Sequence, residues 1–251
     1  MRTPVIAGNW KMHKNGAEAK EFARDFSPRV RDVQEVEIIL APPYISIPSL
    51  VGELEGTKIK VAAQNMHFAD KGAYTGEISP SMLLEQKVTH VIIGHSERRQ
   101  YYAETDESVN LKVKGAISIG LVPIFCVGET LEERENGEMK NVIRIQVEEG
   151  LRGVGSEDPS RLIIAYEPVW AIGTGKTATP EQAQEVHHFI RELLGAIMGA
   201  HNSAMIRILY GGSVNPGNIK SLMGKEDIDG GLVGGASLDP SSFEGIVKFY
   251  E

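Results

Sequence analysis

The sequence predicts an α/β protein in which residues 1–251 form a single closed (β/α)8 barrel. Three observations favour this fold: eight short apolar runs recur along the chain, helix start signals fall between them, and no linker or change in composition divides the 251 residues. Barrels of this kind commonly occupy roughly 250 residues as one domain. A doubly wound open sheet is the structural alternative. It usually has fewer strands, and no GxGxxG motif opens the first helix here.

The eight predicted strands are rich in β-branched residues and read as nearly continuous apolar stretches. They comprise residues 5–10, 36–41, 59–64, 90–94, 122–127, 162–166, 206–210 and 228–233. An antiparallel strand with one solvated face alternates polar and apolar residues, whereas a parallel strand is covered on both faces. The pattern therefore indicates parallel strands inside a layer of helices.

Helix start signals separate these runs. Thr130 with Glu133, and Thr179 with Gln182, form capping boxes, and the second has a proline at the first helical position. Further starts are predicted at Thr105-Asp106, Asn215-Pro216 and Asp239-Pro240. The strand and helix signals thus alternate as a barrel requires.

Charge and composition narrow the class of protein. The chain has 34 acidic and 26 basic residues and a formal net charge of −8, which disfavours nucleic acid or an anionic membrane as the main partner. Its one cysteine, Cys126, excludes an intramolecular disulfide and fits a reducing compartment. With no signal peptide and no run of 18 apolar residues, a cytoplasmic protein without membrane attachment is expected.

Glycine pairs follow the last two predicted strands, as Gly211-Gly212-Ser213 and Gly234-Gly235. Active sites of such barrels form at the carboxyl ends of the strands, and the loops after strands seven and eight commonly bind phosphate. Glycine lets backbone N–H groups approach an anion closely. One such pair could merely make a tight turn, but two in adjacent loops favour a phosphate-bearing substrate.

Two further groups stand at strand ends on the same predicted face. Asn9 and Lys11 follow the first strand, and Lys11 is either a solvated surface cation or a group that stabilises negative charge on a substrate. His95 follows the fourth strand and opens a helix, where the dipole favours a neutral imidazole. Alone, it could equally pack or cap that helix. Adjacent His187 and His188 point to different helix faces, so no metal site is expected.

Glu167 ends the sixth strand and lies at the second position of the most informative segment, residues 166–176. A loop with apolar residues at its start and glycines in its middle follows the carboxylate, ending at Lys176. This composition predicts a mobile lid that buries its apolar residues when substrate is bound. The alternative is an ordinary surface loop after a strand-capping carboxylate.

Five motifs, taken together, resemble those of triosephosphate isomerase. They are Asn9-Trp10-Lys11, the run from Gly94 to Arg99, the run from Ala165 to Lys176, Tyr210-Gly211-Gly212-Ser213 and Leu232-Val233-Gly234-Gly235. They follow one another in order and spacing from the first predicted strand to the eighth. The resemblance implies a TIM barrel that interconverts dihydroxyacetone phosphate and D-glyceraldehyde 3-phosphate without a cofactor, in glycolysis and gluconeogenesis.

The same resemblance implies a role for each matching residue. Glu167 matches the base of that family, and His95 matches its neutral electrophile. Lys11 and Asn9 match groups that stabilise the enediolate. Matches to the phosphate-binding backbone are Gly173, Ser213, Gly234 and Gly235. Matches to supporting positions are Ser96, Glu97 and Cys126, and matches to residues that cover the base under a closed lid are Ile172 and Leu232.

The loop from Asn65 to Glu77 carries Met66, Phe68 and Tyr74 where a solvated loop should be polar. These side chains either pack on their own barrel or enter an interface. In the resembling family this loop docks into a second subunit, and the residue matching Thr75 reaches the neighbour's active site. A homodimer is therefore expected.

Two other functions remain open from the sequence. One is another phosphate-sugar enzyme on the same barrel, such as a Schiff-base aldolase, which needs a lysine near the barrel centre. The sixth strand ends in Glu167 instead, and Lys11 lies outside the apolar core of the first strand. The other is a non-enzymatic phosphate-binding barrel, for which the base, electrophile and lid would be dispensable.

Overall fold

Eight parallel strands close into a barrel in the computed structural model, which describes residues 2–155, 158–172 and 177–251. Each strand pairs with its neighbours in sequence, and β8 returns to pair with β1. The strands are β1 (Val5–Asn9), β2 (Glu37–Ala41), β3 (Lys60–Ala63), β4 (His90–Ile93), β5 (Val122–Val127), β6 (Ile163–Tyr166), β7 (Arg207–Tyr210) and β8 (Gly230–Val233). The predicted (β/α)8 fold is confirmed, and each predicted strand lies within two residues of an observed one.

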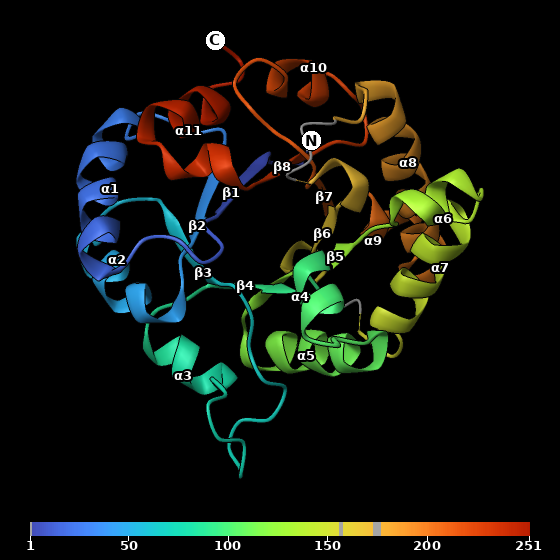
Figure 1. Ribbon diagram of the computed structural model, residues 1–251, viewed down its shortest axis with the longest axis horizontal. Coiled ribbons are helices and arrows are strands. Elements are labelled where there is room, and N and C mark those ends of the chain that lie inside the picture. Colours follow the sequence, from blue (N-terminus) through green and yellow to red (C-terminus); the bar gives the residue numbers. More distant parts are fainter. Residues whose placement is uncertain (1, 156–157, 173–176) are drawn as a thin grey trace.

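Helices surround the strands as an outer ring (Figure 1). The α-helices are α1 (Gly16–Arg29), α2 (Ile47–Glu53), α3 (Pro80–Glu85), α4 (Ser96–Tyr101), α5 (Asp106–Ile119), α6 (Leu131–Glu135), α7 (Met139–Gly150), α8 (Pro180–Met198), α9 (Ala200–Ser203), α10 (Ile219–Met223) and α11 (Pro240–Val247). Short 3₁₀ turns are η1 (Tyr44–Ser46), η2 (Pro159–Arg161), η3 (Val169–Ala171) and η4 (Gly235–Leu238). Within the described ranges, no helix combines the length and apolarity needed to cross a membrane.

Local sequence signals set most of the helix starts. The capping boxes at Thr130 and Thr179 are both present, and Asp239 caps α11 through its side chain. The start predicted at Asn215-Pro216 is wrong, because α10 begins at Ile219. Asn215 Oδ1 instead accepts the N–H of Gly217 at 2.9 Å and makes a turn. A short polar side chain that bonds its own backbone two residues on competes with helix formation.

The apolar core has two layers, which explains why the strands lack an alternating pattern. Ile124 and Cys126 of β5 lie in the cluster inside the barrel, whereas Phe125 and Val127 lie in the larger cluster between barrel and helices. Successive side chains of a strand point to opposite faces, and here both faces are buried. The inner cluster makes the barrel a packed core and leaves the strand ends to form a site.

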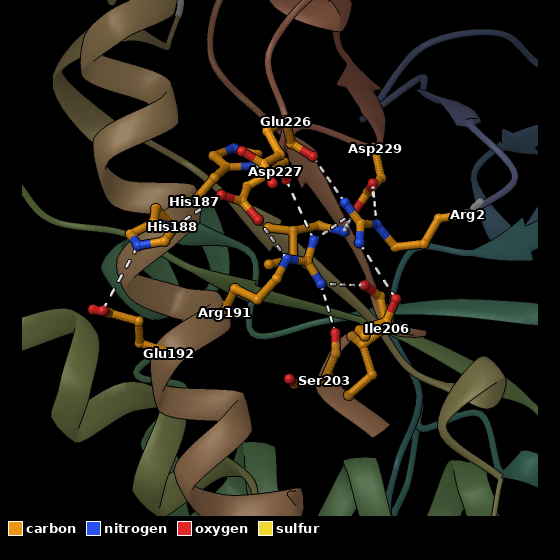
Figure 2. Close-up of polar contacts among 12 residues, drawn as sticks. Arg2, His187, His188, Arg191, Glu192, Ser203, Ile206, Glu226, Asp227 and Asp229 are labelled. Atoms are coloured by element: carbon orange, nitrogen blue, oxygen red, sulfur yellow. Dashed lines mark hydrogen bonds and ion pairs between the residues drawn. The ribbon is translucent and has the colours of Figure 1, made fainter. Parts of the chain in front are cut away.

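An ion-pair network holds the seam between β8 and β1 at the amino ends of the strands (Figure 2). Arg191 of α8 donates to Asp227 and to Asp229, each at 2.7 Å, and Arg2 pairs with Asp229. The Arg191 guanidinium also donates to the backbone carbonyl oxygens of Ser203, the last residue of α9, and of Ile206, just before β7. The network therefore ties the chain's first residues, α8 and β8 together at the barrel end opposite the carboxyl ends of the strands.

The loop after β3 projects from the barrel (Figure 1). Met66 is fully buried in its own barrel, so for this residue the self-packing alternative holds. Phe68 and Tyr74 are 38% and 47% exposed, and both contact the His67 ring, with centroids 4.3 and 4.1 Å from it. The tip of the loop therefore presents aromatic surface to its surroundings.

Candidate active site

The carboxyl ends of the strands surround a cavity of about 260 Å³. Its lining includes nine of the residues predicted from the sequence: Asn9, Lys11, His95, Glu167, Ile172, Ser213, Leu232, Gly234 and Gly235. Gly211, Gly212, Val214 and Ala236 complete the wall. Barrel closure thus brings together residues that are up to 226 positions apart in the sequence, from Asn9 to Gly235.

Glu167 and His95 are in direct contact in this cavity. Glu167 Oε1 lies 2.9 Å from His95 Nε2, and Glu167 Oε2 accepts the backbone N–H of Ser96 at 2.9 Å. Both side chains are almost fully buried. The carboxylate therefore has a partner for each oxygen, both at the start of α4.

The backbone indicates which imidazole nitrogen carries the proton. His95 caps α4, and its Nδ1 accepts the N–H of Glu97 at 3.2 Å. A nitrogen that accepts a hydrogen bond carries no proton, so the ring in this arrangement is neutral with its proton on Nε2. Nε2–H then donates to Glu167. The capping role and the predicted chemical role of His95 therefore coexist.

Burial and neighbouring charges shift the pKa values of Glu167 and His95 in opposite directions. Burial raises the pKa of Glu167, but His95, the Ser96 N–H and Lys11 outweigh it, so the pKa lies below its usual value. Burial lowers the pKa of His95, whereas the carboxylates of Glu167 and Glu97 raise it above its ordinary value. The increase depends mainly on Glu167. A ligand that draws Glu167 away would therefore remove most of the rise in the His95 pKa. Burial of the ring and the hydrogen bond accepted by Nδ1 would then favour the neutral imidazole.

Lys11 brings a positive charge to the same cavity. Its Nζ lies 2.6 Å from Glu97 Oε1, and its backbone N–H donates to Asn9 Oδ1 at 3.0 Å. Lys11 has a φ of +50°, a conformation uncommon for residues other than glycine. Its carbonyl oxygen accepts a hydrogen bond from Gln64 at 2.8 Å, which helps to hold that backbone. Glu97 thus neutralises and orients Lys11 without lining the cavity.

The glycine loops form the opposite wall. Gly234 follows β8, Gly235 is the first residue of η4, and Ser213 lies after β7. Ser213 Oγ donates to the carbonyl oxygen of Ala171 at 2.8 Å, so the loop after β7 contacts the segment after β6. Gly173, the predicted phosphate ligand in that segment, lies outside the described residues, as do residues 174–176.

The start of the loop after β6 is already packed. Ala171 is buried, and Val169, Trp170 and Ile172 are half-buried. These apolar residues are thus partly covered in this structure, and closure of the loop over a ligand stays a prediction. The residues form the turn η3, and the indole Nε1 of Trp170 donates to Glu129 Oε1 at 2.9 Å.

Glu129 is a polar residue that the sequence argument missed. It is fully buried and lies two residues after β5. The rule that polar residues at the carboxyl ends of strands merit attention would have selected it.

Cys126 lies inside the barrel and does not line the cavity. Burial raises the pKa of its thiol well above the usual value, so the side chain acts as a small apolar group. Across the part of the chain that the structure describes, no cluster of three or more His, Cys, Asp or Glu residues could hold a metal ion.

Comparison with known proteins gives a consistent result. The family model described as "Triosephosphate isomerase" matches residues 4–250. Relatives with that name come from Carboxydothermus hydrogenoformans, 57% identical over 99% of each chain, and Geobacter metallireducens, 51% identical over 99% of each. Another, from Clostridium botulinum, is 53% identical over 99% of this chain and 100% of its own. On this full-length match, the chain belongs to the triosephosphate isomerase family of isomerases.

Proposed function

We propose that residues 1–251 act as one catalytic domain that interconverts dihydroxyacetone phosphate and D-glyceraldehyde 3-phosphate, in glycolysis and gluconeogenesis. The observation that carries the proposal is the contact of Glu167 with His95 at 2.9 Å, in a cavity that Lys11 and two glycine loops also line. A carboxylate, a neutral imidazole and a cation facing one space are suited to moving a proton next to a carbonyl group.

In the proposed complex, the substrate phosphate lies against the backbone N–H groups of Ser213, Gly234 and Gly235, with Gly173 as a fourth donor. The carbonyl and hydroxyl oxygens face His95 and Lys11, and Asn9 helps to orient Lys11. The reacting carbon then faces Glu167. The glycine loops and the Glu167–His95 pair line the same cavity of about 260 Å³, so a small phosphate ester held there can contact both.

The proposed chemistry needs only acid–base steps. Glu167 takes the proton from the carbon next to the carbonyl, and that C–H electron pair forms a carbon–carbon double bond. The carbonyl π electrons move to oxygen, giving an enediolate that Lys11 and the Nε2–H of His95 stabilise. His95 transfers a proton between the two oxygens, and Glu167 returns its proton to the adjacent carbon. Nothing is oxidised overall, so the reaction uses no cofactor.

Glu167 must first leave its present partners. Its two oxygens are occupied by His95 and by the Ser96 N–H, whereas catalysis requires one oxygen to face carbon. We propose that substrate displaces this contact while the loop after β6 closes over the cavity. Ile172 and Leu232 would then cover the carboxylate and exclude water, which raises its affinity for a proton. Holding the phosphate also suppresses its elimination from the enediolate.

A homodimer in the cytoplasm is the proposed state of the protein. Large apolar side chains are exposed on loops after β1, β2 and β3: Met12 (94%), Ile45 (80%) and Tyr74 (47%). Tyr44 OH donates to the Asn65 carbonyl oxygen, so the second and third of these loops are in contact. A second copy would cover this apolar surface, with Thr75 directed toward the neighbouring site.

One coupled assay tests the reaction. Purified protein should convert glyceraldehyde 3-phosphate in the presence of a dehydrogenase that consumes dihydroxyacetone phosphate and NADH. Glu167→Asp should bind a phosphate-bearing inhibitor but turn over roughly 100-fold more slowly, because the shorter side chain moves the carboxylate by about 1 Å. Unchanged turnover in this variant would rule out Glu167 as the base. Inactivity of the unmodified protein would rule out the reaction.

A further inference from the structure

A buried carboxylate lies behind the proposed base and binds the chain on both sides of it. Glu129 Oε1 accepts hydrogen bonds from Tyr166 OH at 3.0 Å and from Trp170 Nε1 at 2.9 Å. The backbone oxygen of Glu129 accepts the N–H of Val169 at 3.0 Å. Tyr166 immediately precedes Glu167, and Val169 and Trp170 lie two and three residues after it. Glu129 therefore fixes the backbone from which Glu167 projects.

Arg134 supplies the positive charge for this carboxylate. Its Nη1 donates to the same Oε1 of Glu129 at 2.9 Å, and its guanidinium carbon lies 5.1 Å from the centre of the Trp170 ring. Among the described residues, Arg134 is the only cation in an ion pair with Glu129. The arginine thus holds Glu129 by charge and the Trp170 indole by stacking over its face.

The position of Arg134 is itself fixed by the short helix α6. The capping box of Thr130 and Glu133 starts this helix directly after Glu129, which places Arg134 one turn along it. The backbone of Gly128 packs closely against the backbone of Glu167, because a Cβ added at Gly128 would lie 1.8 Å from the carbonyl oxygen of Glu167. The segment from Gly128 to Arg134 therefore packs directly against the backbone that carries the proposed base.

Loss of the arginine would leave the carboxylate buried without a counter-charge. Glu129 is 0% exposed, and its Oε2 has no hydrogen-bond partner among the described residues. An unpaired buried carboxylate either takes up a proton or draws in water, because the charged form is strongly disfavoured there. Either change weakens the bonds to Tyr166 and Trp170. The residues on both sides of Glu167 would then shift.

We propose that Arg134 is a positioning residue for Glu167, acting through Glu129 and the ring of Trp170. The inference rests on the proposed function, in which Glu167 is the base. Arg134 does not line the cavity, and none of its described contacts reaches the glycine loops after β7 and β8, so its main effect is on the placement of the carboxylate. Removal of Arg134 therefore lowers kcat more than it raises KM.

The test compares Arg134→Met with Arg144→Met. Arg144 on the neighbouring helix α7 also pairs with a glutamate, Glu148 at 3.2 Å, but both partners are 45% exposed. We expect kcat of the folded Arg134→Met protein to fall on the order of 10- to 100-fold, since displacement of a reacting group by about 1 Å costs about 100-fold. KM should stay within about threefold, and Arg144→Met should match the unmodified protein.

Two more variants separate positioning from a general loss of structure. Arg134→Lys keeps the charge but not the planar stack, so its kcat should lie between those of Arg134→Met and the unmodified protein. Adding Glu129→Gln to Arg134→Met removes the unpaired charge while keeping an oxygen that can accept from Tyr166 and Trp170. The double variant should therefore turn over faster than Arg134→Met alone. If Arg134→Met does not fold, Arg134→Lys carries the test, and an unchanged kcat in that variant would overturn the proposal.

Fluorescence gives a readout that does not depend on turnover. The chain has two tryptophans, so Trp10→Phe leaves Trp170 as the only indole. In that background, Arg134→Met should shift the Trp170 emission and increase its quenching by acrylamide, and Arg144→Met should change neither. Unchanged emission and kcat in Arg134→Met, with an active unmodified protein, would overturn only this inference. Inactivity of the unmodified protein would refute the proposed function instead, and the fluorescence would still test whether Arg134 holds Trp170.

Discussion

Alanine at position 211 should displace the proposed base while leaving the barrel intact. Gly211 follows β7, and a Cβ added there would lie 2.8 Å from Glu167 Cγ and 3.2 Å from the Tyr166 carbonyl oxygen. Carbon atoms in contact prefer a separation of about 3.5 Å or more, so the Glu167 side chain must retreat by about 0.7 Å. At about 100-fold per ångström of misplacement, kcat should fall on the order of 20-fold.

The assay for Gly211→Ala measures kcat with the coupled dehydrogenase and inhibitor affinity by calorimetry. Gly52→Ala is the matched control, because a Cβ at position 52 meets nothing within 4 Å. Both variants should unfold within a few degrees of the unmodified protein, and only Gly211→Ala should lose turnover. If Gly211→Ala turns over within threefold of the unmodified protein, the position of Glu167 in this structure does not govern catalysis.

Three more predictions follow from buried charge and exposed apolar surface. Burial lowers the pKa of His187 to about 4, so the unfolded chain takes up the proton first and stability is lost as the pH falls from about 6.5 to 4. The loss should be about 3 kcal/mol in urea titrations at fixed protein concentration, and it should disappear in His187→Gln. Arg191→Met leaves Asp227 and Asp229 buried without the cation that pairs with both. It should therefore lower the free energy of unfolding by about 3–5 kcal/mol in the same titration. A cost below about 1 kcal/mol would contradict that role. Tyr74→Glu should turn the proposed dimer into a monomer in sedimentation equilibrium, and an unmodified protein that sediments as a monomer would contradict the proposed interface.

Residue patterns determine the barrel closely enough to be predicted. Parallel strands buried on both faces leave a continuous apolar run, so β5 could be located from Val122 to Val127 as it is observed. Capping boxes are local, which is why the starts at Thr130 and Thr179 were predicted correctly. The start at Asn215 failed because asparagine caps helices and makes turns by the same kind of bond, and the sequence does not say which bond forms.

The candidate site was less predictable because its contacts depend on barrel closure. His95 and Glu167 could each be selected as polar residues at a strand end. Their contact at 2.9 Å, however, requires the ends of β4 and β6 to face one cavity. The tautomer of His95 follows from one backbone N–H, which no residue pattern specifies. Arg134 also escaped notice, because an arginine in a helix rich in glutamate resembles an ordinary surface residue until Glu129 is seen to be buried beneath it.

The central proposal is that Glu167 carries a proton between adjacent carbons through an enediolate. The most direct measurement converts glyceraldehyde 3-phosphate in D2O and examines the dihydroxyacetone phosphate by nuclear magnetic resonance. A carboxylic acid that exchanges its proton with solvent during turnover should leave deuterium on the carbon that receives it, on one stereochemical face only. Glu167→Gln should form neither product nor deuterium label. Label on both faces would indicate protonation in free solution, and product formed by Glu167→Gln at an unchanged rate would indicate another base. Either result would contradict proton transfer by Glu167.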